Sequence, residues 1–198
     1  MRFTDRSEMV MDFAKQFARK SQFADVNSGH VLMGLLAEGS GIAANVLKNL
    51  GMTVYAILDK IEKTEYARTG VPGTDLPWTN DAVFITKRAL EEAQKLGHLY
   101  VGTEHLLLAI CTLGGLEVLR DGGFLAGEIL SEYCSGDLWR VRNDILSLLG
   151  HSKEKKDEPA KPKKKPVHEI LQRVKVSLAL IEALSGHIKE LERDLQET

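Results

Sequence analysis

Two histidines with similar surroundings are the first residues in this chain that could do chemistry. His30 lies in the segment VNSGHVLMGL, and His105 lies 75 residues later in VGTEHLLLAI. An imidazole ring can act as a general base or bind a metal ion. Neither segment has carboxylates or thiols at the spacing of metal ligands, so we predict no metal site, no cofactor and no catalytic residue. We expect each ring to bond a backbone group and fix helix packing.

Three hydroxyl side chains stand where the apolar patterns begin. Thr4 precedes the first pattern, and Ser28 and Thr103 lie at the start of the two histidine segments. A nucleophilic hydroxyl needs a base beside it at a strained turn, and nothing in the sequence supplies one. Ser and Thr are favoured at the residue before a helix, so we predict that all three are N-caps.

One acidic residue occurs in the second segment only. Glu104 stands where the first segment has Gly29. A carboxylate in the first turn of a helix interacts favourably with the helix dipole, by about 0.3 to 1 kcal/mol. It can also bind a cationic group of a ligand. Glu104 is therefore the main candidate for peptide binding, and Thr103 and Thr79 are the candidates that accompany it.

The spacing of apolar residues predicts the elements that must position these side chains. Intervals of three and four recur along most of the chain, and β-branched runs with period-two alternation are absent. This pattern is typical of an all-α fold. It predicts a first helix up to residue 20, then helices over 28–38, 42–49 and 54–61. Gly51 is predicted to end the third helix in a left-handed conformation.

The same pattern begins again 75 residues later. Val10 corresponds to Ile85, and the two histidines correspond to each other. A duplicated four-helix unit with a pseudo-twofold axis explains the correspondence. The predicted boundaries are 1–68 for the first repeat, 69–77 for the linker and 78–150 for the second repeat. About eight extra residues near GLEVLRDGG predict a larger loop in the second repeat, before a last helix over 137–149.

Two phenylalanines of the first helix have charged counterparts in the second repeat. Phe13 and Phe17 correspond to Arg88 and Glu92, which predicts that this helix face is solvated in the second repeat. Two interpretations of the phenylalanines stay open. They fill the core beside Met9, or they form a hydrophobic groove for clients or for the C-terminal helix.

The C-terminal part of the chain has a different composition. Residues 151–166, HSKEKKDEPAKPKKKP, are rich in lysine and proline, which favours a solvated tether over a nucleic-acid or membrane patch. In residues 167–198, apolar side chains alternate at three and four residues, as in a coiled-coil helix. Self-association through this helix is favoured over folding back onto the domain. The predicted seam residues are Ile170, Val174, Ile181, Leu184, Ile188, Leu191 and Leu195.

Charge and cysteine content narrow the class of protein. The 198 residues have a formal net charge of −2 and a pI of about 6.3, so a nucleic-acid partner is not expected. The two cysteines form no CxxC or Cys/His ligand pattern. No signal peptide and no run long enough to span a bilayer is visible. We therefore expect a cytoplasmic protein without a membrane contact.

Longer stretches of this chain resemble a known family. The first repeat contains EGSGIAANVLKNLG and the second repeat contains KLGHLYVGTEHLLLAI. Both stretches are similar to the double Clp N-terminal domain that precedes the ATPase rings of Clp unfoldases. The resemblance covers residues 1–150 and implies an eight-helix domain that binds substrates or adaptor proteins. No GxxxxGK[ST] phosphate loop occurs in the chain, so ATP hydrolysis by it is not expected.

The resemblance also gives Glu104 a role. In some members of that family, the glutamate of each GTEH motif contacts the guanidinium of a phosphorylated arginine, helped by basic residues near the start of the helix after the linker. Glu104 matches this pattern and Gly29 does not. Asp81, Val83 and Phe84 stand where the family has positive charge, and an aspartate beside a phosphate weakens binding. We therefore expect a plain basic peptide at Glu104.

The function predicted from the sequence is non-enzymatic. The chain is expected to be a stand-alone Clp N-domain protein that recruits clients to a Clp unfoldase or protease, with tethered sites raising the local client concentration. The alternative is a regulatory scaffold that binds one dedicated partner and is unrelated to proteolysis. No arrangement of nucleophile, base and orienting group supports an enzyme.

Overall fold

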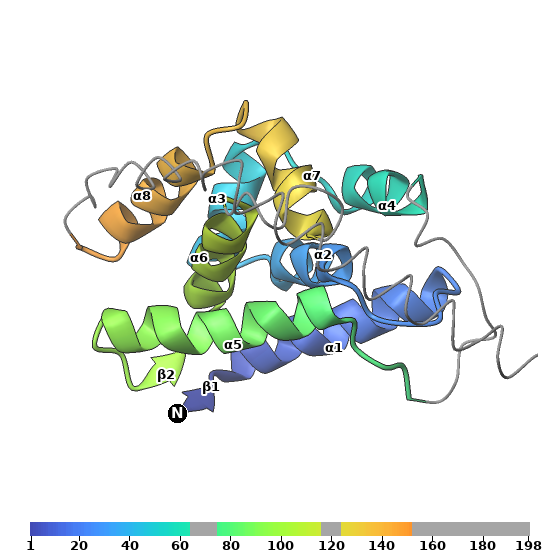
Figure 1. Cartoon of the computed structure of the whole chain (residues 1–198), viewed down its shortest axis with the longest axis horizontal. Coiled ribbons are helices and arrows are strands. Elements are labelled where there is room, and N and C mark those ends of the chain that lie inside the picture. The colour runs from blue at the N-terminus through green and yellow to red at the C-terminus, as the bar shows by residue number, and fades with distance from the viewer. Residues whose placement is uncertain (64–74, 116–123, 152–198) are drawn as a thin grey trace, which may run out of the picture. The chain divides into compact units, whose positions relative to one another are not determined.

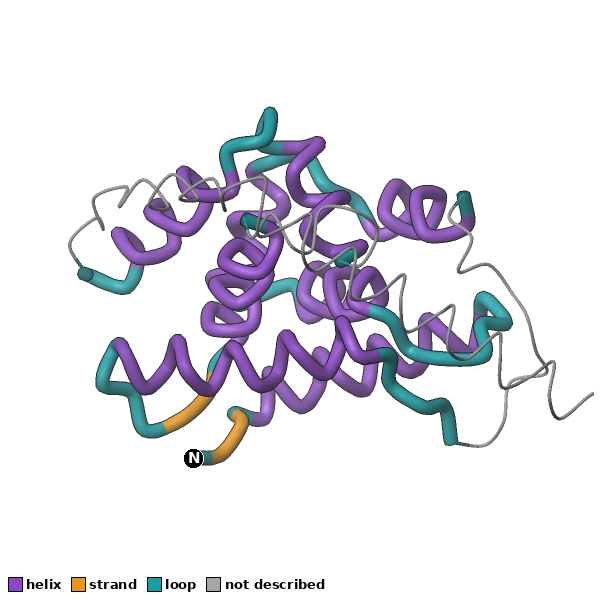
Figure 2. Tube along the Cα trace, viewed as in Figure 1, coloured by secondary structure: helices purple, strands orange, loops and turns teal. Residues whose placement is uncertain are grey.

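The protein is described by a computed structural model that covers residues 1–63, 75–115 and 124–151. These residues form eight helices and two short strands (Figures 1 and 2). The first half contains β1 (Arg2–Phe3), α1 (Asp5–Lys20), α2 (Ser28–Glu38), α3 (Ile42–Asn49) and α4 (Val54–Glu62). The second half contains α5 (Asn80–Lys95), β2 (Tyr100–Val101), α6 (Thr103–Gly114), α7 (Leu125–Tyr133) and α8 (Leu138–Leu148).

The predicted all-α class and the two four-helix repeats are confirmed in the described residues. Each of the eight helices lies where the sequence pattern places it, and Gly51 has a φ of 78°, in the left-handed region. The enlarged loop predicted near GLEVLRDGG falls mostly on residues outside the described ranges. The lysine-rich linker beyond residue 151 and the C-terminal coiled-coil helix also lie outside them.

The core is built around α2 and α6, the two helices that contain the histidines. Helix α2 contacts α1, α3, α4 and α7, and α6 contacts α3, α5, α7 and α8. Most residues of both helices are buried, because a helix that is apolar on all sides must be covered on all sides. No single helix in the described part of the chain is long and apolar enough to cross a membrane. Helices α2 and α3 meet the length and hydropathy criteria only as a pair bent by 100°.

The segment that precedes the first helix of each repeat is hydrogen-bonded to the other repeat. Strand β1 pairs in parallel with β2 of the other repeat, and the Thr4 amide donates to the Val101 carbonyl at 3.0 Å. In the other direction, the Thr79 amide donates to the Val26 carbonyl at 3.1 Å. The start of α1 therefore lies beside the start of α6, and the start of α5 lies beside the start of α2. This crossing decides which residues can share a site.

One prediction about the surface is wrong. Glu92, the counterpart of Phe17, is only 1% exposed, so this face of α5 is not solvated. Helix α8 brings Arg142 to it, with Arg142 Nη1 2.8 Å from Glu92 Oε2, and Arg88 adds a second contact at 2.9 Å. The sequence pattern missed this because a charged residue can be buried when a partner from a distant helix neutralises it.

Candidate functional site

Two of the three predicted N-caps need correction. Thr4 is an N-cap, and its hydroxyl accepts from the Ser7 amide at 3.2 Å. Ser28 and Thr103, however, are the first residues inside their helices, and Asn27 and Gly102 are the caps. The histidine two residues further on is the physical reason. Its ring accepts from the backbone amide of the residue before Ser28 or Thr103, so that preceding residue is the cap of each helix.

The histidines complete these caps. Asn27 N–H donates to His30 Nδ1 at 3.1 Å, and Gly102 N–H donates to His105 Nδ1 at 2.8 Å. Burial lowers the pKa of His30 to about 4 and also lowers the pKa of His105. Both rings are therefore neutral near pH 7, with the proton on Nε2. They serve helix geometry, which is the role expected for them.

Glu104 borders an open hollow of about 390 Å³ where three helices begin. We call it the Glu104 hollow, and it is lined by Thr4, Asp5, Arg6, Gly41, Ile42, Gly102, Thr103 and Glu104. These residues come from the starts of α1, α3 and α6. Thr103 and Glu104 thus share a site, as the sequence predicts, but Thr4, which was predicted only as a cap, also belongs to it.

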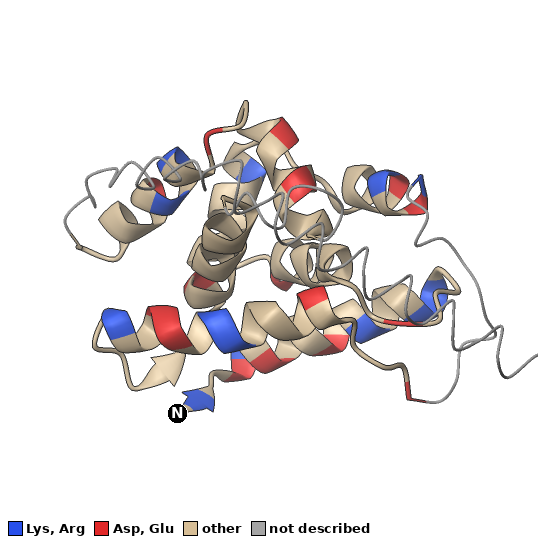
Figure 3. Cartoon of the chain, viewed as in Figure 1, with Lys and Arg blue, Asp and Glu red and all other residues tan. Residues whose placement is uncertain are grey.

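Figure 3 shows basic and acidic residues interspersed along the described helices, and the charges of the Glu104 hollow are mixed as well. Its acidic groups are Asp5 and Glu104, whose side chain is 15% exposed. Arg6 is the cation of the rim, 61% exposed, with Nε 3.8 Å from Glu38 Oε1. Burial alone would raise the pKa of Glu38, but hydrogen bonds from Ser40 and Gly41 lower it overall. The Glu38 carboxylate is therefore already bonded to Ser40 and Gly41 in the turn before α3, which leaves Glu104 and Asp5 to meet a cationic ligand.

The equivalent position of the first repeat is filled by the protein itself. Asp81 Oδ2 accepts from the Ser28 amide at 3.3 Å, and the Asp81 carboxylate also accepts from Thr79 and Ala82. A Cβ atom on Gly29 would lie 2.8 Å from the Ile61 side chain, so a glutamate there would require Ile61 to shift. Thr79 consequently lies with Ser28 and not with Glu104, which corrects the predicted grouping.

The two phenylalanines are not part of the Glu104 hollow. Phe13 and Phe17 are both half-buried, and Phe17 packs against the hydrophobic core. Met9, which was expected beside them in the core, is 45% exposed. The structure therefore assigns Phe17 mainly to packing, and the proposed client groove at this face has no support from the described pockets.

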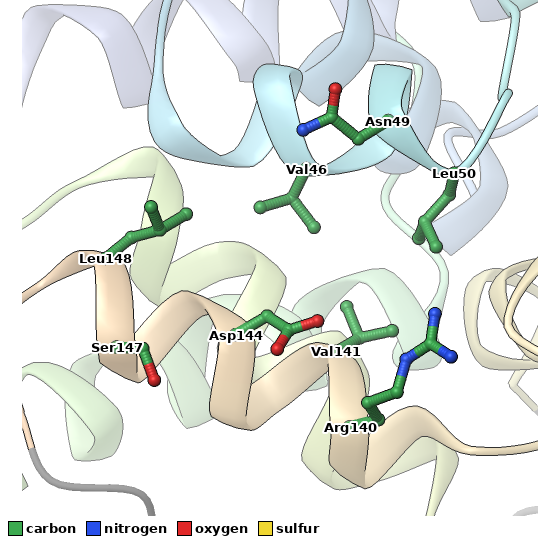
Figure 4. Close-up of a pocket in the computed structure, with 8 residues that line it drawn as sticks. All are labelled: Val46, Asn49, Leu50, Arg140, Val141, Asp144, Ser147 and Leu148. Carbon is green, nitrogen blue, oxygen red and sulfur yellow. The ribbon is translucent and has the colours of Figure 1, made fainter.

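Sequence reasoning missed a groove between α3 and α8, shown in Figure 4. It has a volume of about 510 Å³, and Leu148 at its edge is 62% exposed. In Figure 4, Arg140 and Leu50 lie at one end and Leu148 at the other. The lining residues are Val46, Asn49, Leu50, Arg140, Val141, Asp144, Ser147 and Leu148. The groove joins helices of different repeats, so no local pattern could indicate it.

One cluster has the residue types of a metal site. Ligand atoms of His98, Glu104 and His105 lie within 4.8 Å of one another. The Gly102 amide nevertheless holds His105 in the tautomer with its proton on Nε2, the atom that faces His98 at 2.7 Å. A metal ion at that atom would have to remove this proton from a neutral ring. The donor set therefore fits a hydrogen bond between the two rings better than a bound cation.

Comparison with known proteins places the chain in a family. A model of the Clp repeat (R) N-terminal domain matches residues 2–121, which is more than half of the chain. The chain belongs to this family. This Clp N-domain is 33% identical, over 98% of its length, to an ATP-dependent Clp protease ATP-binding subunit ClpA homolog of Guillardia theta. It is 34% identical, over 77% of its length, to chaperone protein ClpC1, chloroplastic, of Oryza sativa subsp. japonica.

Both relatives are much longer proteins. The Clp N-domain chain spans 23% of the Guillardia theta protein and 16% of the rice protein. Solved structures support the same fold. The N-terminal domain of Arabidopsis thaliana ClpD superposes with a TM-score of 0.56 at 20% identity, over 75% of this chain and 97% of that one. The Hsp104 N-terminal domain of Candida albicans gives 0.58 at 15% identity, over 78% and 98%.

Proposed function

We propose that this Clp N-domain is a non-enzymatic protein-binding module that takes a basic side chain, arginine foremost, of a client peptide or adaptor protein in the Glu104 hollow. One observation supports this most directly. Of the two equivalent positions, the one with a glutamate borders the hollow, whereas at the other Asp81 bonds the Ser28 amide and Gly29 lies against the Ile61 side chain. An open hollow bordered by a carboxylate fits a cationic ligand.

The chemistry of the hollow favours arginine over lysine. A guanidinium offers several N–H donors in one plane and can bond a carboxylate with two of them. Glu104 supplies that carboxylate, and Asp5, at the start of α1, lines the same hollow. A charge-assisted hydrogen bond of this kind contributes about 1 to 3 kcal/mol.

Phosphorylated arginine is the ligand that the family resemblance implies, and it needs a cation for the phosphate. Asp81, the residue that argues against a phosphate in the sequence, lies at the Ser28 position and not in the Glu104 hollow. The cation of the Glu104 hollow is Arg6, whose side chain is largely exposed. The calorimetric test described next therefore also includes a phosphoarginine peptide, whose binding is scored separately from that of the arginine peptide.

The test compares Glu104→Ala with Glu128→Ala by titration calorimetry. Both glutamates lie in the first turn of a helix, so both changes remove a similar helix-dipole interaction, but Glu128 is on α7, away from the hollow. The probes are a short peptide with one arginine, its lysine and citrulline analogues, and its phosphoarginine form. We expect Glu104→Ala to weaken arginine-peptide binding by about 1 to 3 kcal/mol and Glu128→Ala to leave it unchanged.

Equal affinities of the two variants, each with an unchanged circular dichroism spectrum, would reject the Glu104 hollow as the binding site. Gly29→Glu is a poor gain-of-function control, because a side chain there requires Ile61 to move. Stronger binding of the citrulline peptide than of the arginine peptide would also contradict the proposal, since citrulline has no positive charge.

The wider role that we propose is that of an adaptor or accessory for a Clp unfoldase or protease. The relatives that this chain resembles are named as Clp ATP-binding subunits and chaperones, but it spans only 23% and 16% of the length of the two described above. An affinity pull-down from cells that contain their own Clp proteins tests this role. Recovery of a Clp ATPase or protease supports the adaptor. Recovery of one unrelated protein instead supports the regulatory scaffold.

A further inference from the structure

Two pairs of aromatic rings occupy equivalent places in the repeats and differ in one side chain. In the first repeat, Phe23 meets His30 edge-on, with ring centroids 4.8 Å apart and an interplanar angle of 74°. In the second repeat, His98 meets His105 at 4.9 Å and 84°. The fold thus keeps the ring geometry, but a titratable imidazole replaces the phenyl ring that cannot titrate.

A backbone hydrogen bond determines which ring nitrogens of His98 and His105 carry protons. Gly102 N–H donates to His105 Nδ1 at 2.8 Å, so the proton of the neutral His105 ring is on Nε2. That proton points to His98 Nδ1, which lies 2.7 Å away and must accept it. When His98 takes up a second proton, N–H faces N–H across this distance. Protonation of His98 therefore removes the bond, unless His105 changes tautomer and opposes the Gly102 amide instead.

The segment that His98 holds is the one that joins the repeats. Gly97, with a φ of 71°, turns the chain from α5 toward β2, and His98 is the next residue. Three residues later, the Val101 carbonyl accepts from the Thr4 amide at 3.0 Å and from Ser7 Oγ at 2.9 Å. The His98 contact therefore lies at the base of the connection between β2 and the start of α1.

We propose that the His98–His105 hydrogen bond makes this connection dependent on pH. At neutral pH the bond holds residues 98–101 against the start of α6. On acidification, protonation of His98 breaks the bond and increases local opening of β1 and β2. The first repeat has no such dependence, because Phe23 keeps its contact with His30 and has no ring proton to gain.

Other titratable groups lie close to the His98–His105 pair and influence its protonation. The ring of Tyr100 stacks on His98 at 6.1 Å, and the ring of His151, which follows α8, lies 5.8 Å away. Burial is the largest influence on His105 and lowers its pKa, while Glu104 on α6 and Glu92 on α5 act in the opposite direction. A protonated His151 would add a like charge beside His98, so the test includes a variant at that position.

Hydrogen exchange of the full chain, followed by mass spectrometry at about pH 5.5 and about pH 7.5, tests the proposal. After correction for intrinsic exchange rates, we expect protection of residues 1–8 and 98–104 to fall about fivefold at the lower pH, which corresponds to one lost hydrogen bond of ordinary net strength. Residues 23–32, at the Phe23 pair, are the internal control and should not change. His151→Gln should retain the fall.

Two substitutions must abolish the effect. His98→Phe copies the first repeat, and His98→Gln keeps an oxygen that can accept from His105 but cannot take up a proton near neutral pH. If one variant fails to fold, the other still decides. Unchanged protection in the wild-type chain, or an equal fall in whichever variant folds, overturns the proposal. No peptide ligand is present in this experiment, so its outcome is independent of the function proposed for the Glu104 hollow.

Discussion

At the residue scale, a buried ion pair replaces apolar packing in one repeat only. The first repeat has Phe17 at this position of its long helix, and the second has Glu92, paired with Arg142 from α8 and flanked by Arg88 and Lys95. Arg142 also donates to Thr112 at 3.0 Å. Two charges in such a place are tolerated only while each has its partner, because desolvation of an unpaired charge is costly.

Removal of one partner is therefore expected to be severe. Arg142→Met should lower the free energy of unfolding by about 1 to 3 kcal/mol, since the buried Glu92 carboxylate loses its closest partner but keeps its contacts with Arg88 and Lys95. Lys63→Met is the matched control. Its pair with Asp59 is exposed, so we expect a loss of no more than about 0.5 kcal/mol. Urea unfolding of both variants measures this difference. A similar loss of unfolding free energy in the two would show that the buried ion pair stabilises the fold no more than the exposed one.

At the scale of elements, the two repeats differ in the residue of α2 and of α6 at one equivalent position, Gly34 in the first and Ala109 in the second. Gly34 of α2 lies directly against the Val10 carbonyl of α1, and a Cβ atom there would collide with it. The counterpart in α6 is Ala109, which is fully buried and has its methyl group accommodated. Helices α1 and α2 can therefore approach each other only because this position has no side chain.

Alanine at position 34 tests this close approach. Helix propensity alone predicts that Gly34→Ala stabilises the chain by up to about 1 kcal/mol. The collision with backbone, which cannot move as a side-chain end does, should outweigh this gain and give a net loss of about 1 to 3 kcal/mol. Ala109→Gly should lose about 1 kcal/mol, through propensity and a lost methyl contact. Stabilisation by Gly34→Ala in urea unfolding would contradict the predicted crossing.

At the scale of the whole molecule, the C-terminal stripe predicts self-association. We expect the full chain to be oligomeric and a chain that ends at Gly150 to be a folded monomer. Ile181→Asp would bury an unpaired charge in the seam and should dissociate the oligomer. Lys175→Asp, outside the stripe, should not. Light scattering measures all four proteins, and a monomeric full chain at tens of micromolar would rule the coiled coil out.

Helix positions, the repeat and the histidine contacts could be predicted from the sequence because each is a local property. The three-and-four spacing of apolar residues follows from helix geometry, and His30 and His105 bond backbone atoms only three residues away. Even the distinction between the repeats is visible, since Glu104 has Gly29 as its counterpart. The precise caps escaped prediction because an imidazole can complete a cap that Ser or Thr would otherwise occupy.

The pairings between distant elements were decided by the tertiary structure alone. Thr79 and Asp81 belong to the Ser28 position, and Thr4 and Arg6 belong to the Glu104 hollow, because β1 pairs with β2 of the other repeat. Burial of Glu92 depends on Arg142 of α8, a helix far along the chain from α5. Periodicity tells which face of a helix is covered, whereas the identity of the covering residue depends on topology, which no local pattern contains.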